Sequence, residues 1–167
     1  MKRQAIAILA LGVALLAGAA APPKLPINDL KNLPVVETAP YNEKADANAV
    51  VAAAFAKAKK SRKLVMLDLG GNWCPDCLIL ANVMRLPAMQ AFMTAHYEFA
   101  SVDVGRFDKN LQIPARFGFT KKLEGVPTIL VATPDGKLLN RGDVFALSNA
   151  RDMTPQSLAE YLSKWAQ

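Results

Sequence analysis

The chain has 167 residues, a formal net charge of +6 and only two cysteines. A chain of this length can bury a proper hydrophobic core in one domain, so it needs no disulfide merely to fold. No stretch beyond the first 21 residues is long and apolar enough to predict a membrane span. The main cluster of positive charge, residues 57–63, is typical of a solvated helix end, and we expect no nucleic-acid partner.

The first 20 residues have the pattern of a secretory signal peptide. Lys2 and Arg3 precede an apolar stretch from Ala5 to Leu16, and small residues follow it. Cleavage after residue 19 or 20 would leave a chain exported to the periplasm or to another compartment where disulfides persist. The alternative is an uncleaved N-terminal membrane anchor, because residues 5–21 approach the ~17-residue lower limit for a spanning helix.

The rest of the chain divides into a proline-rich arm or linker, residues 21–42, and a single domain, residues 43–167. The arm contains five prolines and shows no helical period, so we expect it to be extended and to pack only near Val35 and Val36. No internal repeat follows it.

Hydrophobic patterns and end signals predict alternating helices and strands in the domain. Asp46 is a possible N-cap, and Thr154 with Pro155 predicts the start of a second helix. The expected elements in chain order are a helix at 46–60, a strand at 64–70, helices at 77–86 and 87–96, a strand at 97–104, a short helix near Pro114, a hairpin of 126–132 with 137–143, and a last helix reaching Trp165. This order predicts an α/β fold with a central mixed sheet of four to five strands, flanked by helices on both faces.

Both cysteines lie in the segment WCPDC, residues 73–77. A closed zinc site needs four ligands, whereas the chain adds only His96 to Cys74 and Cys77. Haem attachment would need a histidine where Leu78 stands. Copper could be held by the thiolates with Met84, Met89 and Met93, although the helical spacing of these methionines is more typical of core packing.

A redox couple is the interpretation that best accounts for the two cysteines. A strand before the motif and a helix after it would place Cys74 at a helix N-terminus, where free N–H groups and the helix dipole stabilise a thiolate. Cys77, one turn further on, would be more buried and would act as the resolving thiol. Asp68 interrupts an apolar strand, and burial there would raise its pKa and allow proton exchange with Cys77, through water. The alternative for Asp68 is a solvated strand face.

Two segments together resemble the thioredoxin superfamily. LVMLDLGGNWCPDC, residues 64–77, is similar to the active-site strand and turn, and FGFTKKLEGVPTILVATPDGK, residues 117–137, is similar to the segment that carries the family's cis-proline. The resemblance covers roughly Asp46 to the C-terminus and implies a thioredoxin-like fold. It also implies that Val126–Pro127 is a cis peptide bond beside the cysteine pair.

The resemblance implies thiol–disulfide exchange as the reaction. The Cys74 thiolate would attack a substrate disulfide, and Cys77 would resolve the mixed disulfide while Asp68 helps to take its proton. No metal and no cofactor is expected beyond the redox-active Cys74–Cys77 disulfide. The residues expected to contact substrate are Trp73, Pro75, Asp76, Val126 and Pro127.

The chain departs from thioredoxin at several positions. Pro75-Asp76 stands where Gly-Pro is usual, Gly70 where tryptophan is common, and Asn82 where the active-site helix often has proline. Two loops, at 120–123 and 142–152, are longer. Because a carboxylate at Asp76 should oppose a nearby thiolate, we expect a reducing or intermediate potential.

These inferences predict an exported thiol:disulfide oxidoreductase that acts on protein disulfides. Its expected partners are those substrates and a membrane-bound or periplasmic redox protein, and we expect a monomer. The alternative function is a thioredoxin-fold module that holds copper or a client protein without turnover.

Overall fold

The computed structural model of the chain describes residues 20–166. The predicted signal peptide, apart from residue 20, therefore lies outside the described residues.

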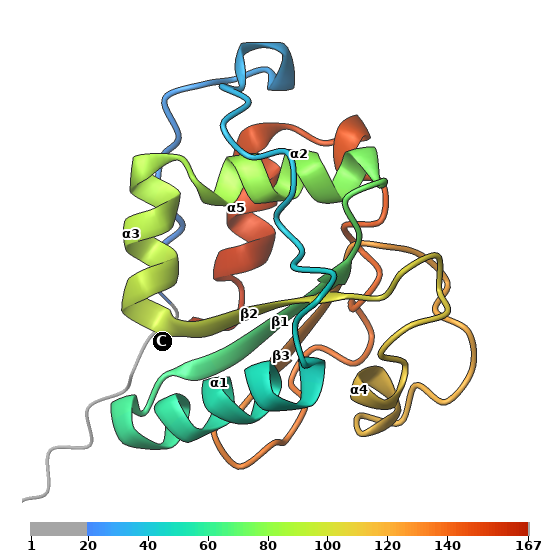
Figure 1. Ribbon diagram of the computed structural model, residues 1–167. Coiled ribbons are helices and arrows are strands. Elements are labelled where there is room, and N and C mark those ends of the chain that lie inside the picture. Colours follow the sequence, from blue (N-terminus) through green and yellow to red (C-terminus); the bar gives the residue numbers. More distant parts are fainter. Residues whose placement is uncertain (1–19, 167) are drawn as a thin grey trace, which may run out of the picture.

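A three-stranded sheet forms the centre of the fold, in the order β2–β1–β3 (Figure 1). The strands are β1 (Leu64–Gly70), β2 (Tyr97–Asp103) and β3 (Thr128–Ala132). β1 pairs in parallel with β2 and antiparallel with β3, so the predicted mixed sheet is confirmed. All of β1 except its first residue is buried, because helices cover both of its faces.

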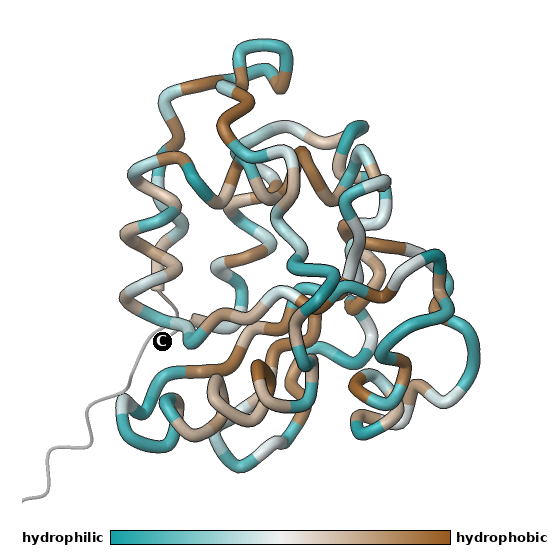
Figure 2. The backbone as a smooth tube through the Cα atoms, in the orientation of Figure 1, coloured by the Kyte–Doolittle hydropathy of each residue, from teal (hydrophilic) through white to brown (hydrophobic). Residues whose placement is uncertain are grey.

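Helices lie on both sides of the sheet, as predicted (Figure 1). One face carries α1 (Ala47–Ser61) and the short α4 (Gln112–Ala115), and the other carries α2 (Pro75–Met84), α3 (Pro87–His96) and α5 (Pro155–Ser163). Alternate residues of β1 enter two separate core clusters: Val65, Leu67 and Leu69 face α1, whereas Met66 faces the other three helices. Figure 2 shows the hydrophobic residues concentrated along these central strands.

The ends of the helices follow the capping signals in the sequence. The Asp46 carboxylate accepts hydrogen bonds from the backbone N–H groups of Asn48 and Ala49, which begins α1. Thr154 caps α5 in a reciprocal pair with Ser157, and Pro155 occupies the first helical position.

The chain breaks between α2 and α3 at Arg85 and Leu86, and Pro87 begins the second helix. Within residues 20–166, no single helix has the length and apolar character of a membrane span, although α2 and α3, bent by 84°, meet that test when taken together.

The predicted hairpin after β3 is reduced to a single bridge, between Ala132 and Leu138. Beyond it, the buried amide side chain of Asn140 takes the place of a strand backbone: it accepts from Val131 N and donates to Ile129 O, at 2.9 and 2.7 Å. Because a side chain fills these positions, no further strand forms, and the sheet of the described residues has three strands rather than four or five.

The arm packs along the domain instead of touching it only near Val35 and Val36. Those two side chains are 72% and 67% exposed, and contact there is made by backbone N–H groups. The apolar contacts lie elsewhere: Leu25, Ile27, Leu30 and Leu33 pack against the α2–α3–α5 core, and Tyr41 is part of the α1 core.

Candidate active site

The two cysteines lie where β1 turns into α2 (Figure 1). Cys74 is the N-cap of α2 and has extended backbone geometry, with Pro75 at the first helical position, exposed to solvent. The Cys77 backbone N–H donates to Cys74 Sγ at 3.2 Å, so the sulfur takes the place that a capping oxygen normally fills. This position stabilises negative charge on Cys74 through N–H groups that the helix leaves free.

The two thiols differ strongly in acidity. Hydrogen bonding from the Cys77 thiol is the main influence that lowers the pKa of Cys74, to about 7, against the opposing effect of burial. The same hydrogen bond, together with burial and the charge of Asp68, raises the pKa of Cys77 far above its usual value. Cys74 is therefore the thiol that ionises near neutral pH, and Cys77 holds its proton.

Asp68 is buried, not solvated: only 1% of its surface is exposed. The Tyr41 hydroxyl donates to its carboxylate, at 3.0 Å from Oδ1 and 2.9 Å from Oδ2. Burial raises the pKa of Asp68 to about 7, against the lowering effect of the Tyr41 hydrogen bond, and negative charge on Cys74 raises it further. A carboxyl group with this pKa can both accept and release a proton near neutral pH.

Asp76, between the cysteines, forms an ion pair with Arg151. Its carboxylate accepts from the Arg151 backbone N–H at 2.8 Å and from Nε at 3.0 and 3.1 Å, and the terminal guanidinium nitrogen also contacts it. Burial of Asp76 opposes its ionisation, but the hydrogen bonds and charge of Arg151 outweigh burial and lower the pKa of the carboxyl. The ionised Asp76 in turn acts to raise the pKa of Cys74, in the direction expected from the sequence.

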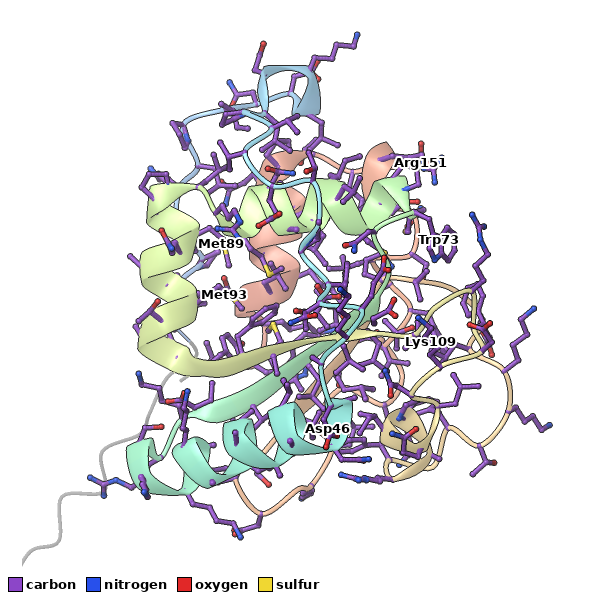
Figure 3. The ribbon with its side chains drawn as sticks, in the orientation of Figure 1. Asp46, Trp73, Met89, Met93, Lys109 and Arg151 are labelled. Atoms are coloured by element: carbon purple, nitrogen blue, oxygen red, sulfur yellow. The ribbon has the colours of Figure 1, made fainter. Side chains whose placement is uncertain are left out.

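Trp73 forms an exposed edge of the site and lies at the same end of the molecule as Arg151 (Figure 3). Its indole N–H donates to Gly105 O at 2.7 Å. The Arg106 guanidinium carbon lies 4.9 Å from the ring centroid, and the Phe107 ring packs edge-on at 6.0 Å. The indole is thus fixed in place and presents a flat apolar surface beside Cys74.

The Val126–Pro127 segment closes the other side of the site. The peptide bond between these residues is cis, and the Cys74 thiol donates to Val126 O at 3.5 Å. β3 begins at the next residue, Thr128, whose hydroxyl donates to Gly125 O at 2.6 Å. Two segments 52 residues apart in the sequence therefore meet at the Cys74 sulfur.

The structure brings the predicted site residues together at the N-terminus of α2: Asp68, Trp73, Cys74, Pro75, Asp76, Cys77, Val126 and Pro127. Sequence reasoning missed two of their partners, Tyr41 and Arg151. Arg151 lies in a short 3-10 helix, Ala150–Asp152, within the segment 142–152, which stood out only as an insertion relative to thioredoxin. Tyr41 lies in the arm, where no periodicity singled it out.

Within residues 20–166, no group of three or more His, Cys, Asp or Glu side chains is placed to hold a metal ion. Met89 and Met93 point into the core from α3 (Figure 3) and belong to the cluster on the α2–α3–α5 face. The two cysteines belong to the other cluster. The methionines therefore pack as core residues, and the geometry gives no support to a copper site shared with the thiols.

The fold and the site define a thioredoxin-like protein. Residues 46–134 match a family model described as thioredoxin-like, and the chain belongs to this family. It is also similar to the crystal structure of a disulphide isomerase from Xylella fastidiosa Temecula1, with 35% sequence identity and a TM-score of 0.70. That similarity covers 75% of this chain and 95% of the isomerase chain.

More distant similarities involve two other solved structures. One is the DsbH oxidoreductase, with 20% identity, a TM-score of 0.43 and coverage of 59% of this chain and 78% of that one. The other is a protein of unknown function from Pseudomonas aeruginosa, with 19% identity, a TM-score of 0.38 and coverage of 71% and 84%. No curated protein sequence matches the chain.

Proposed function

We propose that the protein is an exported thiol:disulfide oxidoreductase that exchanges its Cys74–Cys77 pair with protein disulfides. The observation that carries the proposal is the pair of unequal thiols at the start of α2. Cys74 caps the helix with its pKa lowered to about 7, and Cys77 lies directly beneath it with its proton retained. Membership of the thioredoxin-like family and similarity to a disulphide isomerase support the same reaction.

The exchange takes place in two steps. The Cys74 thiolate attacks one sulfur of a substrate disulfide and the other substrate sulfur leaves, which gives a mixed disulfide. Cys77 then loses its proton towards Asp68 and attacks Cys74, which releases the reduced substrate. The backbone beside the cis Val126–Pro127 bond and the surfaces of Trp73 and Pro75 would hold the extended substrate segment.

The acidity of Cys74 favours a reducing or intermediate potential. A pKa of about 7 corresponds to the thiol of thioredoxin, a reductant, whereas the thiol of the strong oxidant DsbA has a pKa of about 3.5. The Asp76 carboxylate keeps the Cys74 pKa from falling further. A reductant in an oxidising compartment needs a supply of electrons, which a membrane-bound or periplasmic redox partner would provide.

Trapping of the mixed disulfide tests this function. We expect a Cys77→Ser variant, expressed in a bacterial host that exports it, to accumulate covalent adducts through Cys74 with host proteins. Dithiothreitol should reduce these mixed disulfides and release the host proteins. The matched control is Cys74→Ser, which keeps one thiol but should form none. If neither variant forms adducts and the wild-type protein leaves a disulfide substrate intact, the proposed reaction is excluded.

A further inference from the structure

Among residues 20–166, Tyr41 is the only residue whose side chain hydrogen-bonds the Asp68 carboxylate. It is buried in the α1 core although it belongs to the arm. Its backbone is fixed to the active-site turn by Asn72, whose side-chain oxygen accepts from Tyr41 N at 3.0 Å and whose side-chain nitrogen donates to Tyr41 O at 2.9 Å. Tyr41, which hydrogen-bonds the Asp68 carboxylate, is therefore held by Asn72 to the turn just before Cys74.

The Tyr41 hydroxyl also lies beside Cys77, because residue 70 has no side chain. A Cβ at Gly70 would lie 2.4 Å from the Tyr41 hydroxyl oxygen and 2.8 Å from Cys77 Sγ. Both atoms thus border the one space that Gly70 leaves open. Burial, followed by the charges of Asp68 and Cys77, raises the pKa of Tyr41 well above its usual value, so the phenol keeps its proton while it hydrogen-bonds Asp68 next to Cys77.

Asp68 has a route to solvent on the side away from the cysteines. It lies in the wall of a cavity of about 400 Å³ between β2, α2, α3 and the arm. The other titratable side chains around this cavity are Lys63, Arg85, Tyr97 and Glu98, and those facing the carboxylate from the cysteine side are Tyr41, Cys74 and Cys77. A proton taken up by Asp68 can leave through this cavity, whose lining includes neither Cys74 nor Cys77.

We propose that the Tyr41 hydroxyl relays the Cys77 proton to Asp68 during resolution of the mixed disulfide, in place of a water molecule. This inference rests on the proposed thiol–disulfide exchange and names a further residue in its second step. It also gives the arm a role, since the arm supplies the relay.

In this step the Cys77 S–H bond breaks and its proton passes to the Tyr41 oxygen, while the Tyr41 hydroxyl proton passes to the Asp68 carboxylate. The Cys77 thiolate attacks Cys74, a Cys74–Cys77 disulfide forms, and the substrate sulfur leaves as a thiolate with the electron pair of the broken bond. The cysteine pair is oxidised and the substrate is reduced. Tyr41 ends as a phenol again, and Asp68 ends as a carboxylic acid.

A two-phase reaction of the reduced protein with dithiodipyridine separates the two steps. The first release of thiopyridone reports attack by Cys74, and the second reports resolution by Cys77. We expect Tyr41→Phe to leave the first phase within about twofold of wild type and to slow the second by roughly tenfold to a hundredfold at neutral pH, the scale of a lost proton-transfer group. Tyr161→Phe, which removes a hydroxyl far from the cysteines, is the matched control and should change neither phase.

The pH profile distinguishes a relay from a merely structural role. The Tyr41 hydrogen bond lowers the pKa of Asp68, so its loss should shift the midpoint of the second phase to higher pH. Asn72→Ala, which loosens the Tyr41 backbone but keeps the hydroxyl, should slow the same phase by a smaller factor, and it replaces Tyr41→Phe if that variant does not fold. An unchanged rate and midpoint of the second phase in the folded variant would overturn the relay. Absence of both phases in the wild-type protein would instead overturn the proposed function.

Discussion

Two buried carboxyl groups flank the cysteine pair, Asp68 on β1 before it and Asp76 within it, and their pKa values shift in opposite directions although burial acts to raise both. Asp68 and Asp76 are 1% and 3% exposed, yet the pKa of Asp68 is raised to about 7 and that of Asp76 is lowered. Their partners account for the difference: a neutral phenol for Asp68 and a guanidinium for Asp76. Burial alone therefore does not set the ionisation of a carboxyl group, and Asp68 and Asp76 can have different roles beside the cysteine pair.

Asp68 is suited to move a proton, and Asp76 is suited to hold a fixed negative charge. Asp68 faces Cys77, the thiol that must lose a proton during resolution, and its pKa lies where it can take that proton. Asp76 stays ionised next to Cys74 and limits how acidic that thiol becomes.

Replacement of Asp68 should have the largest effect. We expect Asp68→Asn to slow resolution of the mixed disulfide by about 10²-fold near pH 7, because the general base is lost while the shape of the site is kept. Attack by Cys74 should change little. The two phases of reaction with dithiodipyridine measure both rates, and an equal loss in both phases would contradict the assignment of Asp68 to the second step.

The same variant should be more stable than wild type at pH 8. The pKa of Asp68 is raised from 3.8 to about 7, so the folded state binds this proton more tightly than the unfolded chain does. The stabilisation of the folded state by this proton binding is fully present below pH 3.8 and is lost as the pH rises to about 7. The total loss in the free energy of unfolding is roughly 4 kcal/mol. In urea unfolding, the free energy of unfolding of Asp68→Asn should increase relative to that of wild type as the pH rises across that range. A difference that does not change with pH would contradict the raised pKa of Asp68.

Removal of the Arg151 guanidinium should raise the pKa of Asp76, so that its shift resembles that of Asp68. In Arg151→Met, burial acts on Asp76 without the compensating charge, so we expect the pKa of Asp76 to rise from its lowered value. Carboxyl titration by NMR measures this change directly, with Arg85→Met as a control that removes an arginine paired elsewhere, with Glu37. A carboxyl that still titrates below its usual range would show that Arg151 is not the cause.

The smallest expected effect concerns the Cys74 thiol. Because the Asp76 charge raises the pKa of Cys74, Asp76→Asn should lower it and make the pair more oxidising. Equilibration with glutathione at several redox ratios measures the change in potential. A more reducing pair in this variant would contradict the assigned effect of Asp76.

The sequence predicted the parts of the site that are encoded locally. Asp68 within an apolar strand, Cys74 at a helix start and Pro127 before another strand each stand in a short recognisable pattern. Tyr41 and Arg151 bond to partners 27 and 75 residues away, and nothing in their own neighbourhoods indicates those contacts. The fold follows the same division: helix starts and β1 were predicted, but the side chain of Asn140 replaces the predicted hairpin strand through contacts that no periodicity reveals.

The arm illustrates the limit of composition as a guide. Its prolines indicated an extended chain that touches the domain at one point, but the arm contains a 3-10 helix at Leu30–Asn32 and packs against the domain over much of its length. The side chains of Asn72 and Asn82 also hydrogen-bond its backbone at two places, and the first of these sets Tyr41 beside Asp68. Asn82 thus serves to hold the arm at the position where thioredoxin often has a helix-kinking proline.

The most direct test of Cys74 as the activated thiol is the pH dependence of alkylation of the reduced wild-type protein by iodoacetamide, with the modified residue located by peptide mass spectrometry. We expect modification at Cys74 alone, with a rate that rises through a midpoint near pH 7. Modification of Cys77, or a midpoint near the ~8.5 of an ordinary thiol, would contradict the claim that Cys74 is the activated nucleophile of a redox pair.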